Sequence, residues 1–434
     1  MSLDAKRIAR EAIRMLTEGG ADMAQCTVSV SEKREFNMDG GAFSLFRTTF
    51  NQSLYLTAYK GGRRGVLTVN RLDPDSVSSA VAQCLSLADA ASPDDAWSIA
   101  EHIGERSFST GVRTPELDRL FARTRELADG IAERYPRILI EQMIVDHTGI
   151  DSVYADSSDN LYTDGGGFYS VELMFSGHEG EKSSSFFGTG FSVDSLDAPF
   201  LTLGSVAELL DSAERQITTK PIDGKFVGTV IFTPECAGSL LSSIVDNFAS
   251  GNSLIEGTSI WRDKLGKTVA DESVTVALAP HTEGILHRQE YTSDGYPTEN
   301  FNLIENGVLK SFVTSLYAAN KTGVPRSANT SSAFVVPAGD RPLSELIAGV
   351  ERGLLVPRIS GGHPASSGDF SAVAKNSFLI ENGRITDAVS ETMISGNLAE
   401  MLMHPAGASA ERIADGHTVL PYLAFSGITV SGKK

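Results

Sequence analysis

One stretch, Phe226–Gly251, constrains the fold most because it combines a strand, a helix start and an amphipathic helix. Its first part, Val227–Phe232, is short, apolar and rich in β-branched residues, as in a buried strand. Thr233 is expected to cap a helix by accepting a backbone N–H, with Pro234 at the first helical position, where no N–H is needed. Gly251 is expected to end this helix.

The helix in this stretch has two contrasting faces. The apolar face repeats at helical spacing and comprises Ala237, Leu240, Leu241, Ile244, Val245 and Phe248. The opposite face carries hydroxyls, an amide and one acid, from Ser239, Ser242, Ser243, Asp246, Asn247 and Ser250. A zinc peptidase places two histidines and a glutamate on such a helix, and hydroxyl or amide groups do not replace them. By itself, the pattern also fits an ordinary amphipathic helix.

Charge and cysteine usage exclude several classes of partner. The chain has 55 acidic and 37 basic residues, a formal charge of −18, so we expect no direct nucleic-acid binding. Its three cysteines lie far apart in apolar runs, which favours buried thiols in a reducing compartment. The chain begins as a charged amphipathic helix without a signal peptide, and no apolar run is long enough to span a bilayer. We therefore expect a cytoplasmic protein without a membrane partner.

Helical and strand patterns mix without a regular βαβ rhythm, which predicts an α+β fold. The first domain, 1–220, is expected to combine helices with antiparallel strands. Two of these strands are predicted at Phe43–Phe50 and Ser53–Tyr59. An antiparallel meander is predicted over Tyr154–Phe200, broken at Gly165–Gly167.

A second domain, 221–434, is predicted from a polar, Pro- and Gly-containing boundary at Thr218–Gly224. We expect it to be mostly antiparallel β, as a barrel or curved sheets, with short helices. Asn-Gly pairs at Asn306–Gly307 and Asn382–Gly383 predict two tight hairpins, because both residues tolerate positive φ. Short helices are expected at Pro342–Arg352 and Asn397–His404.

Two C-terminal stretches resemble a known family. Gly361–Leu402 reads GGHPASSGDFSAVAKNSFLIENGRITDAVSETMISGNLAEML, and Asn300–Gly323 reads NFNLIENGVLKSFVTSLYAANKTG. Together they resemble the TldD/PmbA family, also called the modulator of DNA gyrase family. SGDFS at Ser367–Ser371 and SGNLAEML at Ser395–Leu402 are similar to its PmbA/TldE branch in particular.

The resemblance implies a degenerate metal site. In this family a TldD-type subunit holds zinc with an HExxxH helix and a later cysteine. A gap-free placement puts Ser242 and Ser243 at the first His and the Glu, Asn247 at the second His, and Ser367 near the cysteine. The resemblance therefore implies no catalytic residue, metal or cofactor in this chain, and zinc in a TldD-type partner.

The function implied by the resemblance is that of a metal-free subunit in a two-component metallopeptidase. Its substrates would be unstructured peptides such as modified-peptide precursors and labile antitoxins. The alternative is a stand-alone homodimeric peptide-binding or scaffold protein without peptidase activity, and the isolated chain could also form a homodimer in the first case.

Two further groups of residues are candidates for a site. Gly368, Asp369, Phe370 and Ser371 are candidate peptide-binding residues. The glycine would permit close backbone approach, and Asp369 and Ser371 would hydrogen-bond backbone groups of an extended peptide. The alternative is that Asp369 only stabilises a turn between strands. Metal binding by His281 and His287 with Glu283 or Glu290 stays open, and so does a cleft role for His363.

Overall fold

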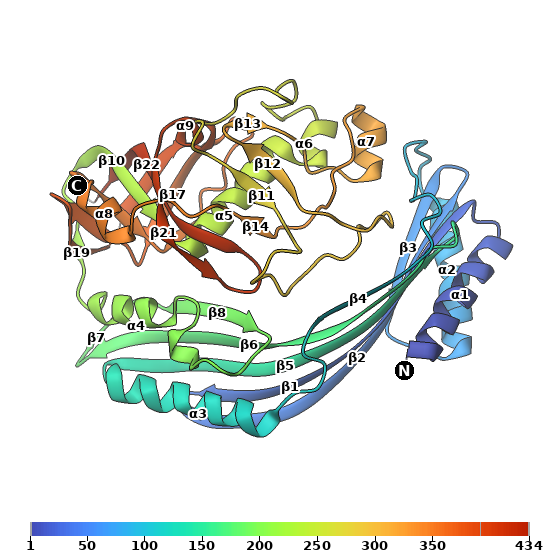
Figure 1. The fold of residues 1–434 in the computed structure, drawn as a ribbon, viewed down its shortest axis with the longest axis horizontal. Helices are drawn as coiled ribbons and strands as arrows, with labels where there is room; N and C mark the ends of the chain where they lie inside the picture. Colours follow the sequence, from blue (N-terminus) through green and yellow to red (C-terminus); the bar gives the residue numbers. More distant parts are fainter. Residues whose placement is uncertain (1, 391, 433–434) are drawn as a thin grey trace.

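A computed structural model describes residues 2–390 and 392–432 of the chain. They form an N-terminal and a C-terminal part, each built on its own sheet with helices packed against it (Figure 1). The α+β prediction is confirmed. None of the helices in these two ranges combines the length and apolar character needed to cross a membrane.

The N-terminal sheet is curled and built from long strands (Figure 1). Its strands follow the order β3-β2-β1-β5-β6-β4, with β7 and β8 also paired to β6. Neighbours are antiparallel except β4 and β6, which run parallel. The strands are β1 Met23–Asp39, β2 Ala42–Lys60, β3 Arg63–Val69, β4 Glu105–Gly111, β5 Ile138–Asp156, β6 Leu161–Glu179, β7 Lys182–Ser183 and β8 Phe187–Val193.

Strand β2 replaces the two strands predicted at Phe43–Phe50 and Ser53–Tyr59. Asn51 and Gln52, between the predicted strands, stay in register opposite Ser31 and Val30 of β1. The split was wrong because polarity alone does not end a strand when neither Gly nor Pro interrupts it.

The glycine triplet at Gly165–Gly167 lies inside β6 and does not break it. A Cβ at Gly166 would lie 2.1 Å from the carbonyl oxygen of Thr110, and one at Gly167 would lie 2.3 Å from that of Val112. The predicted break was therefore wrong: these glycines permit the close approach of β4 and the residue after it.

Helices cover the two ends of the N-terminal sheet (Figure 1). Helices α1 and α2 share a core with β1 and β2 at one end, whereas α3 and α4 share a core with β5, β6 and β8 at the other. The helices are α1 Ser2–Glu18, α2 Pro74–Ala90, α3 Leu117–Arg134 and α4 Val206–Arg215, with a 3₁₀ turn at Phe200–Thr202.

The C-terminal sheet is larger and mixed. Strand β10 lies between β22, which is antiparallel to it, and β15, which is parallel. Most described pairs are antiparallel, as predicted, but β14–β22 and β9–β19 are also parallel. The strands are β9 Lys220–Pro221, β10 Lys225–Phe232, β11 Val276–Leu278, β12 Phe301–Glu305, β13 Val308–Leu309, β14 Phe334–Val335, β15 Arg352–Val356, β16 Arg358–Ser360, β17 Asp369–Lys375, β18 Phe378–Glu381, β19 Arg384–Ser390, β20 Thr392–Asn397, β21 Pro405–Ala414 and β22 Val419–Ser431.

Both Asn-Gly hairpins are confirmed. Asn306 and Gly307 join β12 to β13 with φ of 48° and 76°, and Asn382 and Gly383 join β18 to β19 with φ of 50° and 73°. The C-terminal helices are short: α5 Pro234–Ile244, α6 Gly251–Ile255, α7 Leu316–Thr322, α8 Leu343–Ala348 and α9 Leu398–Met403. Helices α8 and α9 lie where helices were expected, whereas α6 and α7 were not predicted.

The segment that connects the two sheets contains helix α4. Strands of the N-terminal sheet end at Val193, and the first strand of the C-terminal sheet begins at Lys220. The domain boundary at Thr218–Gly224 falls beside that strand and stays a prediction. Contacts cross between the parts nearby, because Gln216 Nε2 donates to the carbonyl of Ser377 at 2.6 Å.

Candidate functional site

Helix α5 follows strand β10 directly, as predicted, with Pro234 in its first turn. Burial in β10 is limited to Val230–Phe232, whereas Val227, in the run predicted to be a buried strand, is 65% exposed. The hydroxyl of Thr233 donates to Glu235 Oε2 at 2.7 Å and makes no side-chain cap to the helix backbone. The predicted cap at Thr233 was therefore wrong, because the nearby carboxylate competes for the hydroxyl.

The helical path continues past α5 as a π-helical turn, Val245–Ala249, and breaks at Ser250, whose backbone is extended. Ser250 caps α6 by accepting a hydrogen bond from Ser253 N. Gly251 begins α6, and a Cβ there would lie 2.6 Å from Cβ of Ala318 in α7. Gly251 thus permits helix packing, and its predicted role as the stop was wrong.

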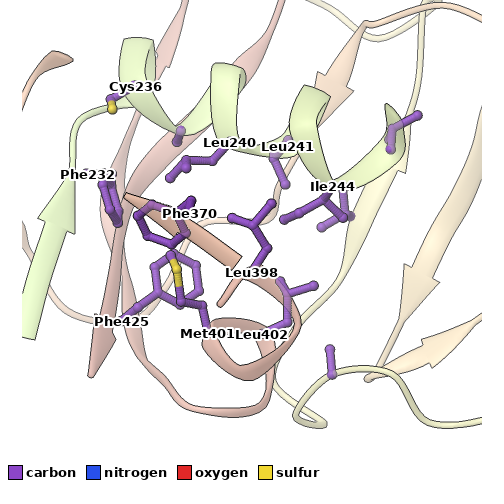
Figure 2. Close-up of a cluster of buried hydrophobic side chains, with 14 of the residues drawn as sticks. Phe232, Cys236, Leu240, Leu241, Ile244, Phe370, Leu398, Met401, Leu402 and Phe425 are labelled. Carbon is purple, nitrogen blue, oxygen red and sulfur yellow. The ribbon is translucent and has the colours of Figure 1, made fainter. Parts of the chain in front are cut away.

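The predicted apolar face of α5 and its extension is buried in the main C-terminal core. Figure 2 shows the side chains of this face pointing toward those of α9 and toward Phe425 of β22. A cavity of about 300 Å³ lies in this contact, lined by Leu240, Leu241, Ile244, Leu398, Met401 and Leu402 among others. The apolar face therefore fixes α5 against α9.

The polar face turns its hydrogen-bonding groups back on the helix. Ser243 Oγ donates to the carbonyl of Ser239 at 3.0 Å, and Asn247 Nδ2 donates to the carbonyl of Ser243 at 2.9 Å. Ser242 is half-buried on the same helix. At two of the three helix positions of the implied metal site, Ser243 and Asn247, the side chain thus bonds to a helix carbonyl one turn earlier.

The loop before β17 forms its own closed set of hydrogen bonds. Ser367 Oγ donates to Asp369 Oδ2 at 2.8 Å. Asn397 Nδ2 donates to Asp369 Oδ1 at 2.9 Å and to the carbonyl of Ser367 at 3.0 Å. The bonds from Asn397 and then Ser367 lower the pKa of the exposed Asp369 carboxyl. The carboxylate is therefore charged at neutral pH and faces solvent.

Gly368 joins this loop to the helix. Its φ is +92°, and a Cβ there would lie 2.7 Å from Cζ of Phe248 in the π-helical turn. The two segments that carry the implied metal positions therefore meet, with Gly368 directly against the residue after Asn247. Only glycine combines this backbone angle with so close an approach.

The other residues of the loop divide between core and surface. Phe370 is buried in the main C-terminal core, opposite Gly396 of β20. Asp369 and Ser371 are exposed. Of the predicted peptide-binding residues, Asp369 and Ser371 thus have hydrogen-bonding groups that face solvent, whereas Phe370 packs inward.

The residues at the implied positions do not fit a zinc ion. Zinc in proteins takes imidazole, thiolate or carboxylate ligands, and Ser242, Ser243, Asn247 and Ser367 supply hydroxyls and an amide. Across residues 2–390 and 392–432, no three His, Cys, Asp or Glu side chains are grouped so that they could hold a metal ion. The metal-free state of the chain stays a prediction.

His281 and His287 lie in different surroundings. His281 Nε2 is 2.8 Å from Thr298 Oγ1, and its Nδ1 is 3.7 Å from Glu290 Oε2. His287 stacks on His417 with ring centroids 3.7 Å apart, and its Nε2 is 2.9 Å from Ser192 Oγ. Burial and then His417 lower the pKa of His287 to about 4. Of the predicted pairings, His281 and Glu290 lie within ion-pair distance.

His363 and Asn397 flank the loop in different ways. His363 is exposed. It follows Gly362, at which an added Cβ would lie 1.8 Å from the carbonyl oxygen of Ser371. Sequence reasoning missed Asn397, which clamps the loop and also caps α9 by accepting from Ala399 N and Glu400 N. An asparagine at the start of an expected helix was the available signal.

A missed acidic pair lies where strand β6 meets a loop of the C-terminal part. Burial and then Glu290 raise the pKa of Asp164, on β6, to about 6. Glu290 is itself buried and accepts a hydrogen bond from Thr110 Oγ1 at 3.3 Å. Sequence offered no signal for this pair, because its members are brought together only by the contact between the two parts of the chain.

Comparison with known proteins finds a matching family model in the C-terminal part and metalloprotease relatives at low identity. Residues 224–432 match the model of the PmbA/TldA metallopeptidase C-terminal domain. The PmbA metalloprotease homologue of Haemophilus influenzae is 25% identical over 427 residues, which cover 90% of this chain and 88% of that protein. A metalloprotease of Methanocaldococcus jannaschii is 28% identical over 227 residues, about half of the length of either protein.

The fold is also similar to that of a solved structure. TldE from Thermococcus kodakarensis superposes with a TM-score of 0.83 at 22% identity, covering 98% of this chain and 100% of that one. At this identity, the likeness supports the fold.

Proposed function

Because this chain belongs to the PmbA/TldD metallopeptidase family, we propose that it is the metal-free, PmbA/TldE-type subunit of a two-component peptidase. A TldD-type partner would hold the zinc and cleave the peptide bond. The observation that carries the proposal is the polar face of α5, where Ser243 and Asn247, at the implied Glu and second His positions, bond to helix carbonyls.

The substrate in this proposal is an extended, unstructured peptide. Backbone N–H groups of such a peptide could donate to the Asp369 carboxylate, and Ser371 could add a hydroxyl partner from the same strand end. Modified-peptide precursors and labile antitoxins are the substrates that the PmbA/TldE resemblance suggests. This chain would position the peptide, and the partner would supply the chemistry.

The test compares this chain alone, a TldD-type chain alone and the two mixed, with an unstructured peptide as substrate. We expect cleavage by the mixture only, and about one zinc per TldD-type chain with none on this one. Cleavage by this chain alone, lost on adding a chelator, would overturn the proposal. Metal counting on each purified subunit gives a readout that does not depend on finding a good substrate.

The second candidate is a stand-alone homodimeric peptide-binding protein. One observation favours it: strand β2 leaves much of its outer edge unpaired. If this candidate is correct, the chain should bind unstructured peptides without a TldD-type chain, and no mixture should cleave them.

A further inference from the structure

The cavity between α5 and α9 is separate from the polar face of α5. It has a volume of about 300 Å³. Side chains from both helices point into the contact where it lies (Figure 2): Leu240, Leu241 and Ile244 from α5, and Leu398, Met401 and Leu402 from α9. Because these α5 residues belong to the apolar face, a molecule held here would lie on the other side of the helix from Ser243 and Asn247.

The end of a strand pairing explains why the core is open at this place. Strand β11 pairs with β14 at Leu278–Phe334 and Ala277–Val335. Continued in the same register, the pairing would reach Thr275 and Pro337, but proline has no N–H to offer a ladder, and β14 ends at Val335. Thr275 and Pro337 line the cavity instead, and Pro337 is exposed. The mouth of the cavity therefore lies at the surface beside Pro337.

Small residues form the wall next to this mouth. They are Ala338 and Gly339, after β14, and Gly407 and Ala408 of β21. The two backbones are in close contact, because a Cβ at Gly339 would lie 2.0 Å from the carbonyl oxygen of Ala408. The wall is thus held by backbone packing, and its side chains are too small to fill the space in front of it.

The chemistry of the lining favours an uncharged ligand. Among the described residues that line the cavity, Asp340 alone is charged, and it is exposed. The two lining hydroxyls already have partners: Ser273 Oγ donates to Asp271 Oδ1 at 2.6 Å, and Thr275 Oγ1 accepts from Asn306 N at 3.1 Å. A charged group placed between the helices would lose its water without gaining a partner.

The volume sets the size of the ligand. An apolar protein cavity of about 150 Å³ is large enough to bind benzene. The cavity between α5 and α9 has about twice that volume, which suits a molecule with two fused aromatic rings.

We propose that this cavity binds a small, uncharged, hydrocarbon-rich molecule of about the size of two fused aromatic rings. The proposal does not depend on the peptidase role, and the full chain by itself is sufficient to test it.

The first test uses naphthalene as the probe and 2-naphthoate, which has the same rings and a carboxylate, as its control. Equilibrium dialysis against the full chain should show about one naphthalene bound per chain, and 2-naphthoate should bind at least about tenfold more weakly. Saturating naphthalene should also raise the urea midpoint followed by circular dichroism, because the unfolded chain has no cavity.

The second test fills the cavity from two sides, with Ala408→Leu on β21 and Leu402→Phe on α9. Each variant should bind naphthalene at least about tenfold more weakly than the unchanged chain. The matched control is Ala410→Leu, which changes an exposed residue of β21 outside the cavity lining and should leave binding unchanged. Without probe, Ala408→Leu should unfold at a urea midpoint no lower than that of Ala410→Leu, because its side chain enters available apolar space.

Several outcomes would overturn the proposal. Naphthalene could fail to bind saturably, or 2-naphthoate could bind equally well. Naphthalene binding that survives both filling variants would place the probe elsewhere, and a lower midpoint for Ala408→Leu than for Ala410→Leu would show that the space is not available. A blocked peptide with a central naphthylalanine that binds where naphthalene does not would assign the cavity to a peptide side chain instead.

Discussion

Strand β10 at the centre of the C-terminal sheet and strand β2 near the edge of the N-terminal sheet contrast in how they are paired. Strand β10 has a hydrogen-bonded neighbour on each side, β15 and β22, over Thr229–Phe232, the half that leads into α5. Strand β2 has neighbours on both sides only over Leu54–Lys60. Strand β10 thus anchors α5 in the sheet, whereas β2 has unpaired backbone groups that could bind a strand of another chain.

This difference separates two kinds of phenylalanine. Phe248, which follows α5, is fully buried, packs against Trp261 with ring centroids 5.0 Å apart, and supports Gly368 of the loop. Phe50 of β2 is largely exposed. In the C-terminal part, Phe248 thus helps to position the candidate site, whereas Phe50 at the N-terminal edge faces solvent.

The largest expected effect comes from exchanging these two residues for alanine. Phe248→Ala should lower the free energy of unfolding by about 3–5 kcal/mol, because it leaves a cavity in the core. Phe50→Ala should change the unfolding of the monomer by less than about 0.5 kcal/mol. Urea unfolding followed by tryptophan fluorescence, at a concentration below any self-association, measures both. If the two variants lost the same free energy of unfolding, the contrast between a buried Phe248 and an exposed Phe50 would be contradicted.

The second prediction concerns the junction between the two regions. His287 has a pKa of about 4 and stays neutral in the folded chain where an unfolded histidine, with a pKa near 6.5, already binds a proton. The unfolded state therefore gains protons first, and stability should fall as pH drops from about 6.5 to about 4, by at most about 1.4 kcal/mol per pH unit.

The measurement is the urea midpoint as a function of pH for the unchanged chain and for His287→Gln. The variant should lose part of the pH slope over this window, and His363→Gln, at an exposed position, is the matched substitution. An unaltered slope in His287→Gln would mean that another group controls the acid sensitivity of the junction.

A smaller effect should follow from adding a methyl group between loop and helix. Gly368→Ala combines an unfavourable positive φ with a Cβ 2.7 Å from Phe248, and should cost about 2–4 kcal/mol when the backbone and steric contributions are added. Gly361→Ala is the matched control, because its φ is +70° and nothing lies within 4 Å of the added Cβ. It should cost about 1–2 kcal/mol. Similar losses in the two variants would show that loop and helix are not closely packed in solution.

The contrast between the regions also explains which features sequence could predict. The apolar face of α5 and both Asn-Gly hairpins were predictable, because helical spacing and positive-φ turns are local signals. The stop at Gly251 and the break at Gly165–Gly167 were wrongly predicted, because glycine there serves a close approach of distant segments. A sequence shows that a residue is glycine, but the tertiary neighbour decides why.

The candidate site divides in the same way. The resemblance singled out Ser242, Ser243, Asn247 and Ser367, and the hydroxyl and amide chemistry of these residues was visible in sequence. The contact between Gly368 and Phe248 was not, since it joins segments far apart in the chain. The open edge of β2 could not be predicted either, because it depends on β3 being shorter than β2 and pairing only with Leu54–Lys60.

The smallest predicted effect tests whether the loop before β17 binds a peptide. In the presence of a TldD-type chain, Asp369→Ala combined with Ser371→Ala should raise KM for an unstructured peptide about fivefold, the loss of about 1 kcal/mol of hydrogen bonding. The value of kcat should be unchanged, because the proposed partner carries out the chemistry. Ser367→Ala, which removes the two bonds of Ser367 Oγ with Asp369 and keeps the carboxylate, should have little effect on KM. An unchanged KM in the double variant would favour the alternative that Asp369 only stabilises its turn. Measuring the self-association of this variant, which should equal that of the unchanged chain, keeps the loop and the β2 edge apart as separate surfaces.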